Sequence, residues 1–273
     1  MRPRLPFSPR HLVLIPLSAV MLLPLIWMLI TSFQTLDESR HFPPVLLPTG
    51  IHWSNYSDAW NAAPFGRFFI NSAVVTLASV AGNLVFCSLA GYAFARLHFF
   101  GRDVLFVALL ATLMVPFQVI MIPTFSIVKD LGLVNSLGGL IVPNLATPFG
   151  VFMLRQFFRT LPIELEEAAR IDGCSRLGVL FRIVMPLSMP ALATLGIVIF
   201  LWTWNDFLWP LIVITSTDQN TVQLGLASFQ GAHQTNWSLL MAGNVMALAP
   251  MLLVFIFAQR WFVRSLAGAG VKG

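Results

Sequence analysis

Long apolar runs, separated by short polar stretches, repeat along almost the whole chain. A helix needs about 20 apolar residues to cross the hydrocarbon core of a bilayer, and six runs come close to that length. They cover residues 12–33, 72–93, 104–123, 137–156, 191–212 and 239–259. The pattern predicts an all-α integral membrane protein with six transmembrane helices. We expect a single transmembrane domain over residues 1–273, with its core at about 68–262.

Composition supports lipid as the main solvent of the chain. Hydrophobic residues make up 57% of the sequence and charged residues only 10%, whereas soluble domains carry about 25% charged residues. The net charge of +5 does not indicate a nucleic-acid partner, because most of the basic residues lie between the apolar runs. We therefore expect the protein to meet the lipid bilayer and no nucleic acid.

The positions of the basic residues predict the orientation of the chain. With the N-terminus in the cytosol, the outer loops hold only Arg40, Arg67 and Lys129, and every other Lys and Arg lies on the cytosolic side. Such a bias marks cytosolic loops. We expect both termini in the cytosol and a multi-pass protein of the cytoplasmic (inner) membrane. The first run is longer than the core of a signal peptide, so we interpret it as an uncleaved span.

The predicted cytosolic loop between the fourth and fifth spans, residues 157–190, is unusually structured for a connector. Pro162 suits the first position of a helix, and Gly173 suits a left-handed helix stop. Ser175 can cap a second short helix, which Pro186 ends. We expect two short helices around a glycine hinge, and we call this segment the elbow.

An apolar stripe lies on the second predicted helix of the elbow. Its members follow helical spacing and are Leu177, Leu180, Phe181 and Val184. An apolar stripe outside the bilayer needs a partner surface. The residues alone leave two alternatives open: the ends of this chain's own spans, or a separate protein.

A motif with fixed spacing runs through the elbow. Glu167-Ala168-Ala169 is followed after three residues by Gly173, and after nine more by Ile183-Val184-Met185-Pro186. This arrangement resembles the EAA loop of ABC importer permeases, whose pattern is E-A-A, three residues, G, nine residues, I-x-L-P. Only Met185, in place of Leu, departs from that pattern, and the change conserves volume.

The resemblance extends over nearly the whole chain. Residues 68–72 and 90–97 resemble the two ends of the family's second span. Residues 204–210, with the sequence WNDFLWP, and the tail at 270–273 are similar to sugar-importer permeases in particular. The resemblance therefore implies a type I ABC importer permease fold and the uptake of a sugar or a sugar-like solute.

The same resemblance implies a role for the elbow. It would dock on an ABC ATPase dimer that binds ATP and Mg, and it would transmit the closure of that dimer to the spans. The residues implied in this coupling are Glu167, Ala168, Ala169, Asp172, Gly173, Ile183 and Pro186. The other implied partners are a homologous second permease subunit and an extracytoplasmic solute-binding protein.

Polar side chains recur at one depth in four of the predicted spans, roughly 4–8 Å outward of the midplane at about 1.5 Å per residue. They are Gln118, Asn144, Asn205, Asp206 and Asn244. Together with Trp202 and Trp209 they are candidates for a solute pathway. Alternatives stay open, because carboxamides can bond helix to helix and tryptophans can lie at the interface or simply pack. An acid inside a span, such as Asp206, normally faces a cavity or a partner.

No catalytic or nucleotide-binding pattern accompanies these features. A P-loop needs Gly-Lys-Ser/Thr, but Lys129 follows Val128 and Lys272 follows Val271. The histidines are scattered without metal-ligand spacing. We therefore expect no enzyme activity, metal or cofactor on this chain. The alternatives are an ABC permease for a glycerophosphodiester, polyol or amino sugar, an ion-coupled secondary transporter, and a membrane-embedded enzyme.

Overall fold

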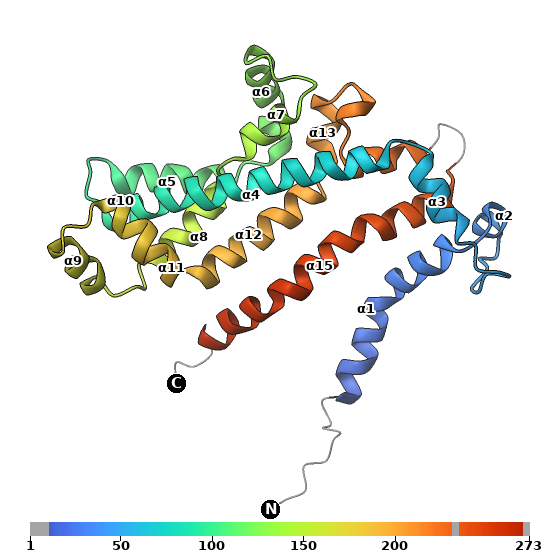
Figure 1. Cartoon of the computed structure of the whole chain (residues 1–273), viewed down its shortest axis with the longest axis horizontal. Coiled ribbons are helices and arrows are strands. Elements are labelled where there is room, and N and C mark those ends of the chain that lie inside the picture. The colour runs from blue at the N-terminus through green and yellow to red at the C-terminus, as the bar shows by residue number, and fades with distance from the viewer. Residues whose placement is uncertain (1–10, 231–234, 270–273) are drawn as a thin grey trace, which may run out of the picture. The chain divides into compact units, whose positions relative to one another are not determined.

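The computed structural model describes residues 11–230 and 235–269, and for residues 258–269 the backbone. Within these ranges the regular secondary structure is helical, turns and loops join the helices, and one isolated bridge pairs Gln230 with Thr235 (Figure 1). It divides into two compact units. The first unit comprises Met1–Phe65 and Gly225–Ala249, and the second comprises Gly66–Leu224 and Pro250–Gly273.

The first unit is built on two long helices and a folded outer loop. Its elements are α1 (His11–Ser32), α2 (Leu36–Arg40), α3 (Ser54–Asn61), η4 (Ala227–Phe229) and the start of α15 (Trp237–Ala269). The apolar stretch of α1 is not buried within the chain, and its side chains are exposed from Leu12 at 71% to Leu29 at 43%. Such a surface suits lipid or another apolar protein surface.

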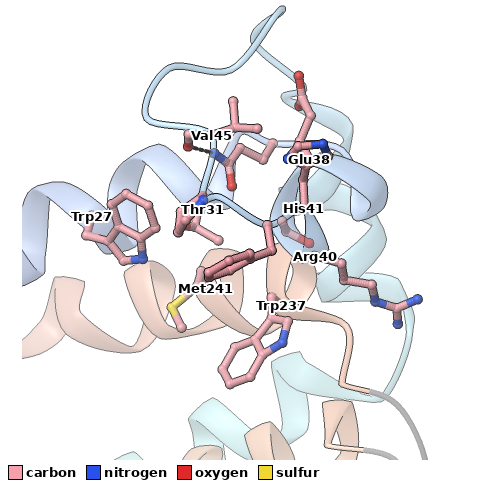
Figure 2. Close-up of a pocket in the computed structure, with 12 residues that line it drawn as sticks. Trp27, Thr31, Glu38, Arg40, His41, Val45, Trp237 and Met241 are labelled. Atoms are coloured by element: carbon pink, nitrogen blue, oxygen red, sulfur yellow. Dashed lines mark hydrogen bonds between the residues drawn. The ribbon is translucent and has the colours of Figure 1, made fainter.

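The loop after α1 is held by hydrogen bonds from buried and capping residues. Thr35 and Glu38 form a capping box at the start of α2, and Glu38 also accepts from the backbone N–H and the hydroxyl of Thr49 at 2.9 and 2.6 Å. The buried Gln34 donates to the carbonyl oxygen of Val45 at 2.7 Å (Figure 2). The loop borders a cavity of about 440 Å³ whose other walls come from α1 and α15. The loop that follows α1 is therefore an ordered structure.

The second unit holds the other helices. They are α4 (Phe65–Arg96), α5 (Arg102–Thr112), α6 (Phe117–Asp130), α7 (Leu137–Ile141), η1 (Val142–Asn144), α8 (Pro148–Phe158), α9 (Glu164–Ile171), α10 (Arg176–Val179), η2 (Leu180–Val184), α11 (Met185–Leu187), α12 (Met189–Trp204), α13 (Leu208–Val213), η3 (Thr217–Gln219) and α14 (Val222–Leu226). Residues of α4, α8 and α12 share one buried apolar cluster, and these helices run side by side in Figure 1. The cluster continues into the elbow through Val179, Leu180 and Val184.

Four helical stretches are long and apolar enough to cross a membrane. They are His11–Ser32, Phe65–Arg96, Leu137–Phe158 and Trp237–Phe257. Two bent pairs also pass this test, Arg102–Thr112 with Phe117–Asp130 at 105° and Arg176–Leu187 with Met189–Trp204 at 82°. The predicted all-α membrane architecture is confirmed, with six spans when each bent pair counts as one.

Three of the predicted spans are not continuous helices. The runs 104–123 and 137–156 break ahead of Pro116 and Pro148, because a residue before proline is driven out of the helical conformation. The run 191–212 breaks after Trp204. There the Asp206 carboxylate accepts from the backbone N–H of Trp209 at 3.3 Å, in the first turn of the next helix.

Small residues bring α4 and the fourth span into close contact. A Cβ atom on Gly82 would lie 2.6 Å from the Cδ2 and 3.0 Å from the carbonyl oxygen of Leu145. A Cβ atom on Gly91 would lie 3.1 Å from the backbone nitrogen of Arg155. Backbone therefore faces backbone here, which small residues permit in membrane bundles.

Replacing Gly82 by Ala should loosen this contact. Backbone atoms of Leu145 cannot turn aside as a side chain can, so we expect a loss of about 1–3 kcal/mol and a lower unfolding temperature in detergent. Gly196→Ala is the matched control, because its Cβ would meet only the Cγ1 of Val80 at 3.7 Å and Ala favours a helix by about 0.5–1 kcal/mol over Gly. Equal unfolding temperatures for the two variants would contradict the close approach.

The outer loop should respond to acid through Glu38. Hydrogen bonds, first from the Thr49 hydroxyl and then from the Thr35 and Thr49 backbone, lower the pKa of this carboxyl from 4.5 to about 2. A depressed pKa means that the ionised carboxylate stabilises the loop fully above about pH 4.5, and that this contribution is lost as the pH falls toward about 2. The amide hydrogen-exchange rates of residues 35–49, corrected for intrinsic rates, should rise only as the pH falls from about 4.5 toward about 2. Glu38→Gln should raise these exchange rates already at neutral pH. Unchanged rates in this variant would show that the carboxylate does not hold the loop.

Candidate functional site

The elbow folds as two helical segments around a left-handed glycine. α9 ends at Ile171, and Gly173 follows with φ of 84°. The Ser175 hydroxyl accepts from the backbone N–H of Gly178 at 3.1 Å and caps α10. The predicted left-handed stop at Gly173 and the cap at Ser175 are confirmed, whereas the helical segment after Ser175 continues through Pro186 to Leu187, so Pro186 does not end it. Pro162 precedes α9, which begins at Glu164, so it does not occupy the first helical position.

A buried ion pair joins the elbow to α4. Glu166 is 5% exposed, and its carboxylate accepts from Arg96 Nε at 2.6 Å and from the Tyr92 hydroxyl at 3.0 Å. Arg96 also donates through Nη2 to the carbonyl oxygen of Leu161 at 2.7 Å. Since a buried charge is costly without a partner, these bonds hold α9 in one position against α4.

Neighbouring residues of α9 have opposite environments. Glu166 and Ala169, three positions apart on one face, are buried, whereas Glu167 and Ala168 are exposed. The sequence motif singles out Glu167 and assigns no role to Glu166, and no pairing partner was predicted for Arg96. The spacing of Glu166 and Ala169 was the available signal for an inward face.

The other residues predicted for coupling lie mostly at the surface. Asp172, Gly173 and Pro186 are exposed, and Ile183 is half-buried. The apolar stripe divides: Leu180 and Val184 are buried in the chain's own core, while Leu177 at 59% and Phe181 at 46% are exposed. The first alternative, packing on the chain's own core, therefore holds for Leu180 and Val184, and the second stays open for Leu177 and Phe181.

A π-helical turn, η2, lies in the middle of the elbow. The backbone N–H of Met185 donates to the carbonyl oxygen of Leu180, five residues earlier. Pro186 follows directly and has no N–H to continue the α-helical ladder. Single π turns are rare and occur often at functional sites. Sequence reasoning did not anticipate this turn.

A cavity of about 910 Å³ lies in the second unit. It gathers five of the seven residues predicted for a solute pathway, Asn144, Trp202, Asn205, Asp206 and Trp209. Gln118 is exposed and does not line the cavity. Asn244 belongs to the first unit and donates to the carbonyl oxygen of Leu240 at 2.9 Å. Within the second unit, Gln118 is therefore not brought together with the other five.

The cavity residues have distinct surroundings. Trp209 is buried and donates through Nε1 to the carbonyl oxygen of Gly139 at 3.1 Å, so it ties α13 to α7. Trp202 is 55% exposed, with its ring centroid 5.3 Å from that of Phe149. Asn205 accepts from the Gln223 carboxamide at 3.4 Å. Trp202 is therefore the better placed of the two tryptophans to meet a solute.

The charge of the cavity comes from one carboxyl group. Asp206 is the acidic residue among its lining residues, which include no Lys, Arg or His. In the part of the chain that the structure describes, no group of three or more His, Cys, Asp or Glu could hold a metal ion. The cavity walls are otherwise apolar side chains, carboxamides and hydroxyls, which suit an uncharged polyhydroxy solute.

Comparison with known proteins places these features in a family. The family model for the binding-protein-dependent transport system inner membrane component matches residues 84–268. The arabinooligosaccharides transport system permease protein AraQ of Halalkalibacterium halodurans is 37% identical over 260 residues, which cover 94% of this chain and 93% of the relative. The sn-glycerol-3-phosphate transport system permease protein UgpE of Pectobacterium atrosepticum is 38% identical over 242 residues, which cover 85% and 86%.

A solved structure supports the fold. A chain of a bacterial ABC transporter involved in the import of the acidic polysaccharide alginate superposes with a TM-score of 0.78 at 24% identity, covering 94% of this chain and 99% of the other. The chain is thus a multi-span inner-membrane permease component of an ABC importer, and it is not itself catalytic. This sets aside the ion-coupled carrier and the membrane-embedded enzyme. Matched over residues 84–268 by the family model, the chain belongs to the family of binding-protein-dependent transport system inner membrane components.

Proposed function

We propose that the chain passes a sugar or sugar-like solute through the cavity of the second unit, driven by an ATPase that docks on the elbow. The observation that carries the proposal is the division of α9 into a face fixed to α4 and an exposed face with the Glu167-Ala168 motif. Because α9 is fixed to α4 on one face and exposed on the other, a partner that binds the exposed face and moves can displace α4 together with α9.

The ion pair makes this transmission stiff. Moving α9 away from α4 would separate Arg96 from Glu166, and breaking a buried pair costs about 3–5 kcal/mol. A displacement of α9 is therefore expected to carry α4 with it. The exposed Ala168 leaves room for close approach of a partner helix, and Glu167 offers it a carboxylate. Gly173 keeps the turn that Asp172 precedes, and Ile183 and Pro186 extend the contact toward α12.

The exposed surfaces suggest further subunits. We infer a homologous second permease, for which the apolar face of α1 is suited, and a dimer of ABC ATPases that binds ATP and Mg on the cytosolic side. An extracytoplasmic solute-binding protein would meet the outer loops. A related transporter structure is in complex with an alginate pentasaccharide-bound periplasmic protein.

The cavity favours a neutral solute. Relatives are named for arabinooligosaccharides and for sn-glycerol-3-phosphate. A phosphate group would call for Arg or Lys, which the lining residues do not include. Carboxamides and an exposed indole suit sugar hydroxyls and a sugar ring. We therefore favour an oligosaccharide or another sugar over a glycerophosphodiester. A polyol remains compatible with the same groups, and an amino sugar could pair with Asp206.

Two adjacent glutamates provide a matched test of the elbow. Glu166→Gln leaves Arg96 with an uncompensated charge and should lower the unfolding temperature, since removing one partner of a buried ion pair costs about 3–5 kcal/mol. Glu167→Gln removes an exposed carboxylate and should leave the unfolding temperature unchanged. It should instead reduce co-purification with the ATPase and solute-stimulated ATP hydrolysis, measured in the assembled transporter. If Glu167→Gln binds the ATPase and transports at wild-type rates, the coupling role of this face is refuted.

Uptake assays test the solute class. Membrane vesicles with the assembled transporter should take up radiolabelled arabinotriose in preference to sn-glycerol-3-phosphate. Trp202→Ala should raise the KM for the sugar about 3- to 10-fold, because an aromatic contact contributes about 0.5–1.5 kcal/mol, and Trp202→Phe should recover most of the affinity. Preferential uptake of sn-glycerol-3-phosphate, or an unchanged KM in Trp202→Ala, would show that the cavity does not select a sugar in this way.

A further inference from the structure

The fourth span is broken where it meets the cavity. η1 ends at Asn144 and α8 begins at Pro148, and Thr147 between them is extended, with φ of −121° and ψ of 140°. Pro143, Asn144, Ala146 and Thr147 all line the cavity. Non-helical backbone is tolerated at membrane depth only where protein buries it or where it lines a wet cavity. The break and the cavity wall are therefore one structural feature.

One side chain of α4 binds both ends of this break. Asn83 is fully buried, and its Nδ2 donates to the carbonyl oxygen of Asn144 at 2.7 Å. Its Oδ1 accepts from the Thr147 hydroxyl at 2.8 Å. That hydroxyl in turn accepts from the backbone N–H of Gly150 at 3.1 Å and caps α8. Asn83 thus connects the end of η1 to the start of α8.

The surroundings of Asn83 leave it little freedom. Its Nδ2 also donates to the carbonyl oxygen of Ser79 at 2.9 Å, in its own helix. One residue earlier, Gly82 lets the backbone of Leu145 lie against α4. One turn later, the Cys87 thiol contacts the backbone of Thr147, with its sulfur 3.4 Å from the Thr147 nitrogen. Three positions on one face of α4 therefore hold the same turn.

We propose that Asn83 is a positioning residue for solute passage, which fixes the turn 144–147 so that Asn144 and Thr147 face the solute. The proposal rests on the proposed role of the cavity as the solute pathway. Helix-to-helix bonding alone would need one hydrogen bond between two regular helices. Here the donor and the acceptor of a single carboxamide are both used on the two ends of a non-helical turn.

The first test separates affinity from turnover. Asn83→Leu keeps the branched shape of the side chain, with larger end groups, and removes its hydrogen bonds to both ends of the turn. Thr147→Val removes the hydroxyl that donates to Asn83. Each variant should raise the KM for uptake on the order of 10-fold, as expected for the loss of buried hydrogen bonds. The probe is radiolabelled arabinotriose, or sn-glycerol-3-phosphate if the transporter takes up that solute instead. Thr147→Ser keeps the hydroxyl and should raise the KM less than Thr147→Val. The double variant should raise the KM by less than the product of the two single effects, because the two variants share the hydrogen bond between Asn83 and Thr147.

Ser79→Ala is the control for general damage to α4. Ser79 lies one turn before Asn83, is equally buried, and its hydroxyl has no partner among the described residues. This variant should keep the wild-type KM. Co-purification of the ATPase shows that each variant assembles. A wild-type KM in assembled Asn83→Leu, or an equal rise in Ser79→Ala, would overturn the positioning role.

A second readout does not depend on the identity of the solute. Ala146 is exposed and lines the cavity, so Ala146→Cys should react with N-ethylmaleimide, whereas Val151→Cys, 4% exposed in α8, should not. Adding Asn83→Leu should change the labelling rate at residue 146 at least about 3-fold, and Ser79→Ala should not. An unchanged labelling rate at residue 146 would refute the positioning role of Asn83. This result does not depend on whether Glu167→Gln uncouples the transporter, so the positioning role and the proposed coupling can fail independently.

Discussion

In an apolar solvent, a peptide group that leaves a helix must find its hydrogen bond within the protein, and the second unit depends on how it meets this constraint. The turn before Pro148 is bound by Asn83. The turn after Trp204 is bound by the carboxylate of Asp206. Both turns border the same cavity. The irregular backbone and the polar cavity wall therefore have one physical origin, and an uncharged solute would meet groups that already serve the fold.

The same constraint, applied to charge, organises the elbow. Arg96 at the end of α4 would be unpaired without Glu166, and Glu166 would be a buried lone acid without Arg96. Pairing them fixes one face of α9 and leaves Glu167 on the other. The π turn η2 and the exposed Phe181 lie further along the same segment. Two adjacent glutamates thus have different surroundings: Glu166 attaches α9 to the chain, and Glu167 is exposed.

Residue depth along the spans groups polar residues of four helices, but it does not assign them to one cavity wall. Gln118 and Asn205 were predicted at similar depth, yet only Asn205 reaches the cavity. Distance along a helix axis does not determine the direction in which a side chain points around the bundle. The role of Asn83 was not predicted for a related reason. A carboxamide in an apolar run gives the same sequence pattern whether it hydrogen-bonds within its own helix or to a turn of a neighbouring span. Glu166 was missed because its partner lies on another helix.

The sequence by itself determined the helical class, the apolar runs, the left-handed turn at Gly173 and the motif that marks the family. These depend on residues within a few positions of one another, where side-chain type and spacing act directly on the backbone. The tertiary structure alone decided which runs break, which face of α9 is bare and which polar groups share a cavity. Those outcomes rest on contacts such as Asn83 with Asn144, 61 positions apart, and Arg96 with Glu166, 70 positions apart. No local pattern encodes such contacts, because they exist only once the helices pack.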